Sequence, residues 1–360
     1  MRNKIRVGIL GGAGYTGGEL VRILLNHPHS EIVFVHSKSN SGNLLSDVHT
    51  DLLGETDLKF SGSLSDSIDV LFLCLGHGES VKFLSENKIN KKIKIIDLSQ
   101  DFRIASRQSV QADPFAKGRI RPQGESFGGL AVSPGGSVLW RIGSRQFVYG
   151  LPELNREEIK KADNIANPGC FATAIQLALL PLADKKLLND EIHVSAITGS
   201  TGAGQALSAS NHFTWRNNNI SVYKAFQHQH LGEITQSIKQ LQKNFSHELN
   251  FIPFRGNFTR GILAAVYVNS KLPLEEAKNL FKEYYKLHPF VKISDKTPDI
   301  KQVVNTNKCI LYLEKHTNKL LIQSVIDNLT KGASGQAVQN MNLMLRLEET
   351  IGLKLKASAF

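Results

Sequence analysis

The N-terminal segment combines an apolar run, a glycine-rich turn and a helical pattern. Residues 5–10 are apolar and rich in β-branched side chains, and Leu20, Ile23 and Leu24 then recur at helical spacing. A strand, a glycine turn and a helix in this order are typical of a dinucleotide-binding domain. The glycines permit the tight turn and let backbone N–H groups approach a pyrophosphate at the helix start. An ordinary strand-to-helix turn is the alternative. The cofactor contacts predicted here are Gly11, Gly14, Tyr15, Thr16 and Gly17.

The end of the second predicted strand (residues 31–35) indicates which dinucleotide would bind. An acidic residue at this point would bind a ribose 2′-hydroxyl and disfavour a 2′-phosphate. The chain instead has Lys38 between Ser37 and Ser39. A cation flanked by two hydroxyls suits NADP, so these three residues are predicted cofactor contacts. A solvated lysine in a loop is the alternative.

Two further buried strands are predicted at residues 70–75 and 93–98. Ligands of doubly wound sheets lie beyond the carboxyl ends of the strands. Gly76 and His77 follow the first strand, and both are expected to border the cofactor. Arg103 follows the second strand and is a candidate anion clamp, because a guanidinium can bind phosphate or carboxylate through two hydrogen bonds.

The segment Asn167-Pro168-Gly169-Cys170 precedes an apolar helical run. Pro168 and Gly169 break regular structure, so the Cys170 thiol should lie in the first helical turn, beside unpaired N–H groups and the positive end of the helix dipole. Such a position lowers a thiol pKa and leaves the thiol partly exposed, as a nucleophile requires. A small buried cysteine in a turn is the alternative.

His230 and Glu233 lie three residues apart at a predicted helix start. They share one helix face, where the carboxylate can orient the imidazole and the imidazole can act as acid and base to the thiol. Metal ligation by His228 and His230 is an alternative. No third ligand with suitable spacing appears, so no metal is predicted. A structural role for both histidines is the remaining alternative.

Glycine-rich segments later in the chain are further candidates for cofactor contact. Residues 199–204 resemble a phosphate-binding loop in composition, although they lack the P-loop Lys-Ser/Thr pair. Residues 327–336 open a final helix with Ala337, Met341 and Met344 on one face. Residues 251–258 are expected to form a loop. The contacts predicted in the two glycine-rich segments are Ser200, Gly202, Asn328 and Gly332.

Length, charge and cysteine content limit the class of protein. The 360 residues suggest two domains, and no apolar run reaches membrane-spanning length. Three separated cysteines indicate neither a disulfide framework nor a metal pair, which favours the cytoplasm. The formal net charge is +11, yet the basic residues form no nucleic-acid motif. A positive field that attracts small anionic substrates is the interpretation, with no nucleic-acid or membrane partner.

Residues 105–146 differ in composition from the rest of the chain. Arginines outnumber lysines there, and glycine pairs and serines interrupt any periodicity. The interval reads as an insertion or flexible loop. A hairpin that pairs residues 130–132 with residues 138–140 is one arrangement that the pattern allows.

Several motifs together resemble the N-acyl-γ-glutamyl-phosphate reductases of arginine biosynthesis, in the aspartate-semialdehyde dehydrogenase-like superfamily. They occur in family order, outside residues 105–146. The matching segments are G-x-x-G-Y-T-G-x-E-L at 11–20, D-L-S-x-D-F-R at 97–103, Y-G-L-P-E-L-N at 149–155, N-P-G-C at 167–170, H-x-H-x-x-E-I at 228–234, T-R-G-I at 259–262 and K-G-A-x-G-Q-A-V-Q-N at 331–340.

The resemblance implies an α/β protein with a Rossmann-type NADP-binding domain (residues 1–166) and an α+β catalytic and oligomerisation domain (residues 167–330). A C-terminal helix (residues 331–360) would return to the first domain. The implied assembly is a homo-oligomer, a dimer or tetramer. The implied site has Cys170 as nucleophile, His230 as acid/base, Glu233 in support, Arg103 on the substrate phosphate, and Asn167 and Glu153 as substrate contacts.

The implied reaction is the NADPH-dependent conversion of N-acetyl-L-glutamyl 5-phosphate to the semialdehyde through a cysteine thioester. One departure concerns the acyl group, because relatives commonly show F-T-P-H-L where this chain has Phe251-Ile252-Pro253-Phe254-Arg255. Arg255 could favour a second carboxylate, as in an N-succinyl substrate. Aminoadipyl or aspartyl phosphate would be further alternatives. A cofactor-binding protein without catalysis is the alternative of another class.

Overall fold

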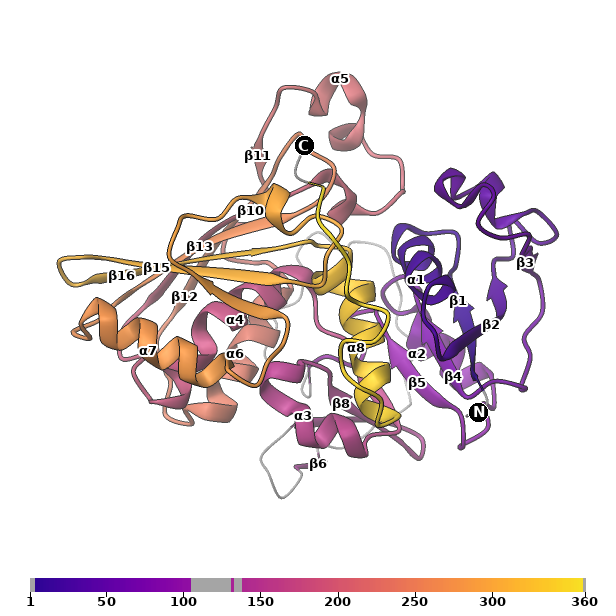
Figure 1. Cartoon of the computed structure of the whole chain (residues 1–360), viewed down its shortest axis with the longest axis horizontal. Helices are drawn as coiled ribbons and strands as arrows, with labels where there is room; N and C mark the ends of the chain where they lie inside the picture. Colours follow the sequence, from indigo (N-terminus) through magenta and orange to yellow (C-terminus); the bar gives the residue numbers. More distant parts are fainter. Residues whose placement is uncertain (1–3, 105–130, 133–137, 359–360) are drawn as a thin grey trace, which may run out of the picture.

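The protein is built on two β-sheets, and separate hydrophobic cores pack on each (Figure 1). The structure is a computed structural model, and it describes residues 4–104, 131–132 and 138–358. The first sheet is sandwiched between two cores, one on each face, and the second sheet is packed against helices. The predicted α/β fold, a doubly wound domain followed by an α+β domain, is confirmed.

The first sheet has the strand order β3-β2-β1-β4-β5-β9-β8-β7-β6. In sheet order, the seven strands from β3 through β9 to β8 are all parallel. Their apolar side chains are buried on both faces, as expected for strands that are joined by crossovers. The strands are β1 (Ile5–Leu10), β2 (Ser30–His36), β3 (Phe60–Ser61), β4 (Val70–Leu73), β5 (Lys94–Asp97), β6 (Ala131–Val132), β7 (Val138–Ile142), β8 (Arg145–Tyr149) and β9 (Asn164–Ala166), and the helices of this part are α1 (Tyr15–Leu25), α2 (Glu79–Glu86) and α3 (Pro152–Lys161).

The interval 105–146 contributes strands to this sheet, so its reading as a loop is wrong for residues 138–146. Strand β7 pairs antiparallel with β8, and Ala131 faces Leu139 in the predicted hairpin. Arg145 fixes β8 by donating to the Ile93 carbonyl (3.2 Å) and to Asn164 Oδ1 (2.7 Å). The rest of the interval, residues 105–130 and 133–137, lies outside the described residues.

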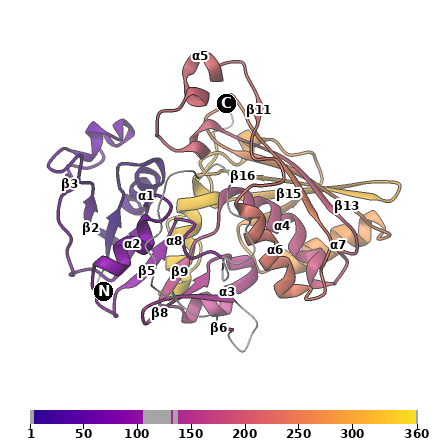
Figure 2. The ribbon, with the colours of Figure 1, turned by 180° about the vertical axis from the view of Figure 1, so that it is seen from behind.

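The second sheet has the order β11-β12-β10-β13-β16-β15-β14 and is mixed, with β10–β12 and β14–β15 as its parallel pairs. Helices α4, α6 and α7 pack on it from one side (Figures 1 and 2). Its strands are β10 (Ile192–Thr198), β11 (Ser221–Val222), β12 (Leu249–Arg255), β13 (Ile262–Asn269), β14 (Val291–Ser294), β15 (Cys309–His316) and β16 (Lys319–Ile326), and its helices are α4 (Cys170–Asp184), α5 (Phe213–Arg216), α6 (His230–Leu241) and α7 (Leu274–Tyr285).

The predicted loop at residues 251–258 is wrong for its first half, which belongs to strand β12. Pro253 suggested a loop because proline has no N–H to donate to a sheet. Here the neighbouring strand β11 pairs with β12 through Phe254 and Arg255 instead, and the Pro253 carbonyl accepts the Tyr223 N–H at 3.1 Å. On the other side, the ladder with β10 runs through this residue, with Ala196 opposite Pro253.

The chain returns to the first sheet at its C-terminal end. A short π-helix, η7 (Thr330–Ser334), follows β16 and runs into α8 (Gly335–Met344). Helix α8 lies between the two sheets (Figure 1), against α1, α3 and β5. Ala337, Val338 and Met341 of this helix are buried in the same core as Val7 and Ile9 of β1. Residues far apart in the sequence thus complete one core.

Candidate active site

Cys170 is the first residue of α4, as the Pro-Gly break predicts. Gly169 caps the helix without a side chain, and Cys170 is half-buried while Phe171 to Ala183 are all buried. Helix α4 is apolar on every face because it packs on β13 and β16 as well as on α6. Burial of the whole helix fixes the position of the thiol at its N-terminus.

Two glycines allow close packing around the cysteine turn. A Cβ atom at Gly169 would overlap the His230 ring, and one at Gly332 would lie 2.8 Å from Cys170 Cβ. Gly332 belongs to η7, so this segment contacts the cysteine itself. The sequence analysis predicted Gly332 as a cofactor contact; the structure places it directly against Cys170.

The Glu233 carboxylate joins four elements at the cysteine turn. Its Oε2 accepts the Gly169 N–H and the Tyr149 hydroxyl, both at 2.9 Å, and its Oε1 accepts from Arg103 Nη1 at 3.3 Å. Oε1 also lies 3.9 Å from His230 Nε2, which is an ion-pair distance and not a hydrogen bond. Glu233 therefore holds the turn before Cys170 more directly than it orients the imidazole.

The structure contradicts the expected low pKa of the thiol. Burial raises the pKa of Cys170 to about 11, although the backbone N–H of Phe171 and the charge of Arg103 both favour the thiolate. Burial, followed by the charges of Arg103 and His77, holds the pKa of His230 well below its ordinary value. The site thus pairs a protonated thiol with a neutral imidazole, which is the arrangement in which His230 can accept the thiol proton.

The second histidine supports the first. The Nδ1 atom of His228 accepts the His230 N–H at 3.2 Å, and burial lowers the pKa of His228 to about 3. The two rings pack edge to face with centroids 4.5 Å apart. Among the described residues, no group of three or more His, Cys, Asp or Glu side chains is arranged to hold a metal ion.

Two predicted substrate contacts are already engaged within the protein. The Asn167 side chain donates to the Ala333 carbonyl (3.1 Å) and accepts from Asn340 (3.0 Å). Glu153 is fully buried and accepts from Lys331 Nζ at 2.8 Å. Asn167 and Glu153 therefore fix η7 and α8, and their roles as substrate contacts stay predictions.

Arg103 lies at the site but is not a free cation. It is 7% exposed, and its guanidinium donates to Glu233 and to the Leu98 carbonyl (2.7 Å). Its Nε atom is buried and has no hydrogen-bond partner within the described part of the chain. One donor of this side chain thus stays available for an anion beside Cys170.

Arg255 approaches the site from the end of β12. Its guanidinium lies over the Tyr223 ring, 4.6 Å from the centroid, and its Nε is buried without a hydrogen-bond partner in the described residues. Burial and the neighbouring Cys170 thiol raise the pKa of Tyr223 above its ordinary value. Tyr223 therefore connects Arg255 to the surroundings of the nucleophile.

The predicted nucleotide turn has the required shape. Gly11 has a φ of +75°, in the left-handed region, and a Cβ atom at Gly17 would lie 2.7 Å from the Gly11 carbonyl oxygen. Helix α1 begins at Tyr15 and Thr16, with Gly14 as an N-cap that has no capping side chain. Its first N–H groups are therefore available to a phosphate, so the site fits a dinucleotide.

The other predicted cofactor contacts fall in two groups, and the first lies at the ends of the strands beside β1. Lys38 and Ser39 are exposed beyond β2, next to buried Ser37, and Gly76 and His77 are exposed beyond β4. The charge of His77 acts on His230, so this loop lies near the cysteine site.

The second group lies in loops of the second domain. Ser200 and Gly202 lie in a short 3₁₀ turn (η4, Ser200–Ala203). Both polar ends of Asn328 are used, because its side chain accepts the Gly261 N–H (2.7 Å) and donates to Thr201 Oγ1 (3.0 Å). Asn328 therefore links two loops, and its contact with the cofactor stays a prediction.

Comparison with known proteins decides the family. The chain is 54% identical to a Parabacteroides distasonis protein named N-acetyl-gamma-glutamyl-phosphate reductase, over 99% of this chain and 100% of that one. It is 56% identical to a protein of the same name from Azobacteroides pseudotrichonymphae, again over 99% and 100%. This chain belongs to the N-acetyl-gamma-glutamyl-phosphate reductase family. The resemblance noted in the sequence is thereby confirmed.

Family models divide this reductase as its two sheets do. Residues 6–162 match the semialdehyde dehydrogenase NAD binding domain, and residues 170–328 match the semialdehyde dehydrogenase dimerisation domain. The fold is similar to aspartate semialdehyde dehydrogenase II of Vibrio cholerae, with TM-score 0.66 and 16% identity over 96% of this chain and 99% of that one. The Candida albicans aspartate semialdehyde dehydrogenase solved with NADP gives 0.64 and 13%, over 97% and 100%.

Some residues of the reductase site were missed from the sequence. Tyr149 donates to Glu233 and accepts from Gln176 Nε2 at 2.9 Å, and His49 Nε2 donates to the Gly12 carbonyl at 2.7 Å. Asp101 accepts the Gly78 N–H at 2.7 Å and so stabilises the start of α2. A polar residue within an otherwise apolar run, as Tyr149 and Gln176 are, is the signal that could have marked two of them.

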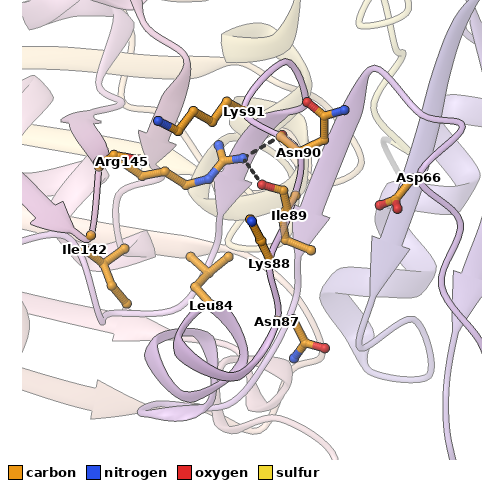
Figure 3. A pocket seen from close by; sticks show the side chains of 11 residues that line it. Asp66, Leu84, Asn87, Lys88, Ile89, Asn90, Lys91, Ile142 and Arg145 are labelled. Atoms are coloured by element: carbon orange, nitrogen blue, oxygen red, sulfur yellow. Dashed lines mark hydrogen bonds between the residues drawn. The ribbon is translucent and has the colours of Figure 1, made fainter.

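A pocket of about 660 Å³ opens elsewhere on the first domain, between the segment before β5 and the β7–β8 turn. Figure 3 shows Arg145 in its lining, where the guanidinium donates to the Ile89 and Asn90 carbonyls at 3.2 and 2.8 Å. None of the predicted site residues lines this pocket.

No helix in the described ranges has the length and apolar character needed to cross a membrane.

Proposed function

We propose that this enzyme reduces N-acetyl-L-glutamyl 5-phosphate to N-acetyl-L-glutamate 5-semialdehyde with NADPH, in arginine biosynthesis. The observation that carries the proposal is the place of Cys170 at the N-terminus of α4, directly after a glycine that Glu233 holds and against which the His230 ring packs, in a chain of this reductase family. Residues 1–166 would bind the nucleotide, residues 167–330 would hold the substrate and the oligomer contacts, and residues 331–360 would complete the first domain. The assembly would be a homo-oligomer.

The first half-reaction forms a thioester. Cys170 Sγ attacks the acyl carbon while His230 takes the thiol proton, the bond from that carbon to the phosphate oxygen breaks, and inorganic phosphate leaves. Arg103 Nε, which is buried and unpaired among the described residues, supports a contact to the phosphate. The N–H groups at the start of α4 would stabilise the oxyanion.

The second half-reaction releases the aldehyde. NADPH, when bound, supplies the hydride that reduces the thioester carbon. The bond from that carbon to Cys170 Sγ then breaks, and His230 returns its proton to the thiolate. The nucleotide would be held by the glycine turn at Gly11, Gly14 and Gly17, by the start of α1 and by the loop around Gly76.

The test of the proposed function is NADPH oxidation by the purified chain with acetylglutamyl, aspartyl and aminoadipyl phosphates. Oxidation with either of the last two alone would overturn the proposal.

Lys38 should determine the preference for NADPH over NADH. It is exposed beyond β2, next to Ser37 and Ser39, whose hydroxyls lie 3.4 Å apart. Lys38→Asp should weaken NADPH binding by roughly tenfold to a hundredfold, because a charge-assisted hydrogen bond is lost and a repulsive charge is introduced. Binding of NADH, measured by fluorescence titration, should change little. Lys82→Asp on α2 makes the same charge change at an exposed site and is the control; equal losses for both nucleotides would contradict the prediction.

Arg255 favours a second candidate substrate, the N-succinyl analogue. Its unpaired Nε and its place over Tyr223 supply a cation for a second carboxylate. Arg255→Leu should then cost the succinyl substrate about 1–3 kcal/mol in kcat/KM and leave the acetyl substrate nearly unchanged. Arg255→Lys keeps the charge and should retain part of the succinyl activity. Parallel losses on both substrates would show that Arg255 does not contact the acyl group.

A further inference from the structure

Arg260 joins the two domains through a buried ion-pair network. It lies two residues before β13, and its Nη1 and Nη2 atoms donate to the two carboxylate oxygens of Glu19 on α1 at 3.0 and 2.9 Å. Its other edge donates to Asp327, from Nε at 3.1 Å and from Nη2 at 3.2 Å. One guanidinium thus holds the nucleotide-side helix and the end of β16 together.

The burial of this network favours a fixed geometry. The side chains of Arg260, Glu19 and Asp327 are 17%, 5% and 0% exposed. Burial opposes ionisation of Glu19, but hydrogen bonds from Arg22 and Arg260 outweigh it and lower the pKa of Glu19. Buried ion pairs add little net stability but require well-defined geometry. We therefore expect this network to fix the position of α1 relative to the end of β16.

Asp327 carries this alignment to the nucleophile. Its Oδ1 accepts the N–H groups of Leu329 (2.7 Å) and Thr330 (3.1 Å), and its carbonyl accepts the Gly332 N–H at 2.9 Å. These bonds shape η7, and Gly332 of η7 lies against Cys170. The path from Arg260 to the thiol therefore passes through a single buried carboxylate and one short helical turn.

A second contact joins the same two parts. Ser334 Oγ donates to the Thr16 carbonyl at 2.8 Å. Thr16 lies in the first turn of α1, directly after the glycine turn. The start of α1 is therefore tied to η7 at one point, while Glu19, one turn further along α1, is held by Arg260.

We propose that Arg260 is a positioning residue that aligns the nucleotide with the Cys170 thioester for hydride transfer. The inference rests on the proposed function. Thioester formation uses Cys170, His230 and Arg103, and Arg103 is joined to the cysteine domain by its own bond to Glu233. Hydride transfer also requires the nucleotide at the start of α1, the helix that Arg260 holds through Glu19. Loss of Arg260 should therefore impair the second half-reaction selectively.

The experiment measures the two half-reactions separately in Arg260→Met. Phosphate release from the acyl phosphate without NADPH should stay within about twofold of wild type. Single-turnover hydride transfer should slow by on the order of tenfold to a hundredfold, since a small misplacement of reacting atoms has effects of this size. The isotope effect with deuterated NADPH should rise as hydride transfer becomes limiting. Arg260→Lys, which keeps the charge, should recover part of the rate.

The control is Arg22→Met, which removes another cation that donates to Glu19 (Nη2 to Oε1, 2.6 Å) but does not reach Asp327; it should leave both half-reactions at wild-type rates. NADPH affinity and thermal unfolding are measured on every variant. Should Arg260→Met fail to fold, Glu19→Gln takes its place with the same expectation. Equal slowing of both half-reactions, or none, would overturn the inference. Absence of phosphate release in the wild type would instead overturn the proposed function.

Discussion

Cys170→Ala should abolish turnover and leave nucleotide binding almost unchanged. The thiol supplies the bond that holds the acyl group, and the alanine side chain cannot form it. The nucleotide turn at Gly11 and Gly17 lies on the other sheet and does not depend on the sulfur. Steady-state NADPH oxidation should fall by at least about three orders of magnitude, and phosphate release without NADPH should disappear with it.

Cys309→Ala is the matched control for this experiment. Cys309 is buried in β15, where its sulfur lies 3.5 Å from Ser324 Oγ, so the variant removes a thiol that has no role in the proposed chemistry. It should retain activity, and NADPH titrations should agree among the three proteins. Substantial turnover by Cys170→Ala would show that another group forms the covalent bond.

His230→Asn should cost about 10²–10⁴-fold in kcat/KM and change the pH dependence. With the pKa of Cys170 at about 11, few thiols are ionised at neutral pH, so attack depends on a base beside the sulfur. Without the imidazole, activity should follow the thiolate fraction and rise about tenfold per pH unit between pH 7 and 9. The wild type should rise less, because the depressed pKa of His230 keeps the imidazole neutral throughout this range.

The measurement is the slope of log kcat/KM against pH for each protein. His193→Asn is the control, because His193 lies on β10, where its ring stacks on that of Tyr267. A variant with the same slope as the wild type would show that His230 does not take the thiol proton.

The local elements of the site could be predicted from the sequence. The apolar run before Gly11 and the Pro-Gly break before Cys170 each depend on a few neighbouring residues, and the structure has the strand and the helix at these places. The pairing of Glu233 could not be predicted. Its partners come from Tyr149, Gly169 and Arg103, which only the packing of two domains brings together.

The prediction of a low thiol pKa was wrong because it, too, depends on how the domains pack. Sequence shows that Cys170 begins a helix, which favours the thiolate, but it does not show how much protein surrounds the sulfur, and burial outweighs the helix effect. The bonds that Asn167 and Glu153 make inside the protein could not be predicted either. Their partners, Asn340 and Lys331, lie more than 150 residues away in the chain.

The return of α8 to the first sheet has a consequence for the order in which the protein matures during synthesis. Strands β1, β2 and β4 are translated first, yet the core beneath them stays open until Ala337, Val338 and Met341 arrive. All strands of the second sheet leave the ribosome before that helix does. Because domains fold as their residues emerge, all strands of the cysteine domain should be able to pair before the nucleotide domain receives its last helix. We therefore expect the sheet that carries the Cys170 helix to form before the NADPH-binding domain has its full core.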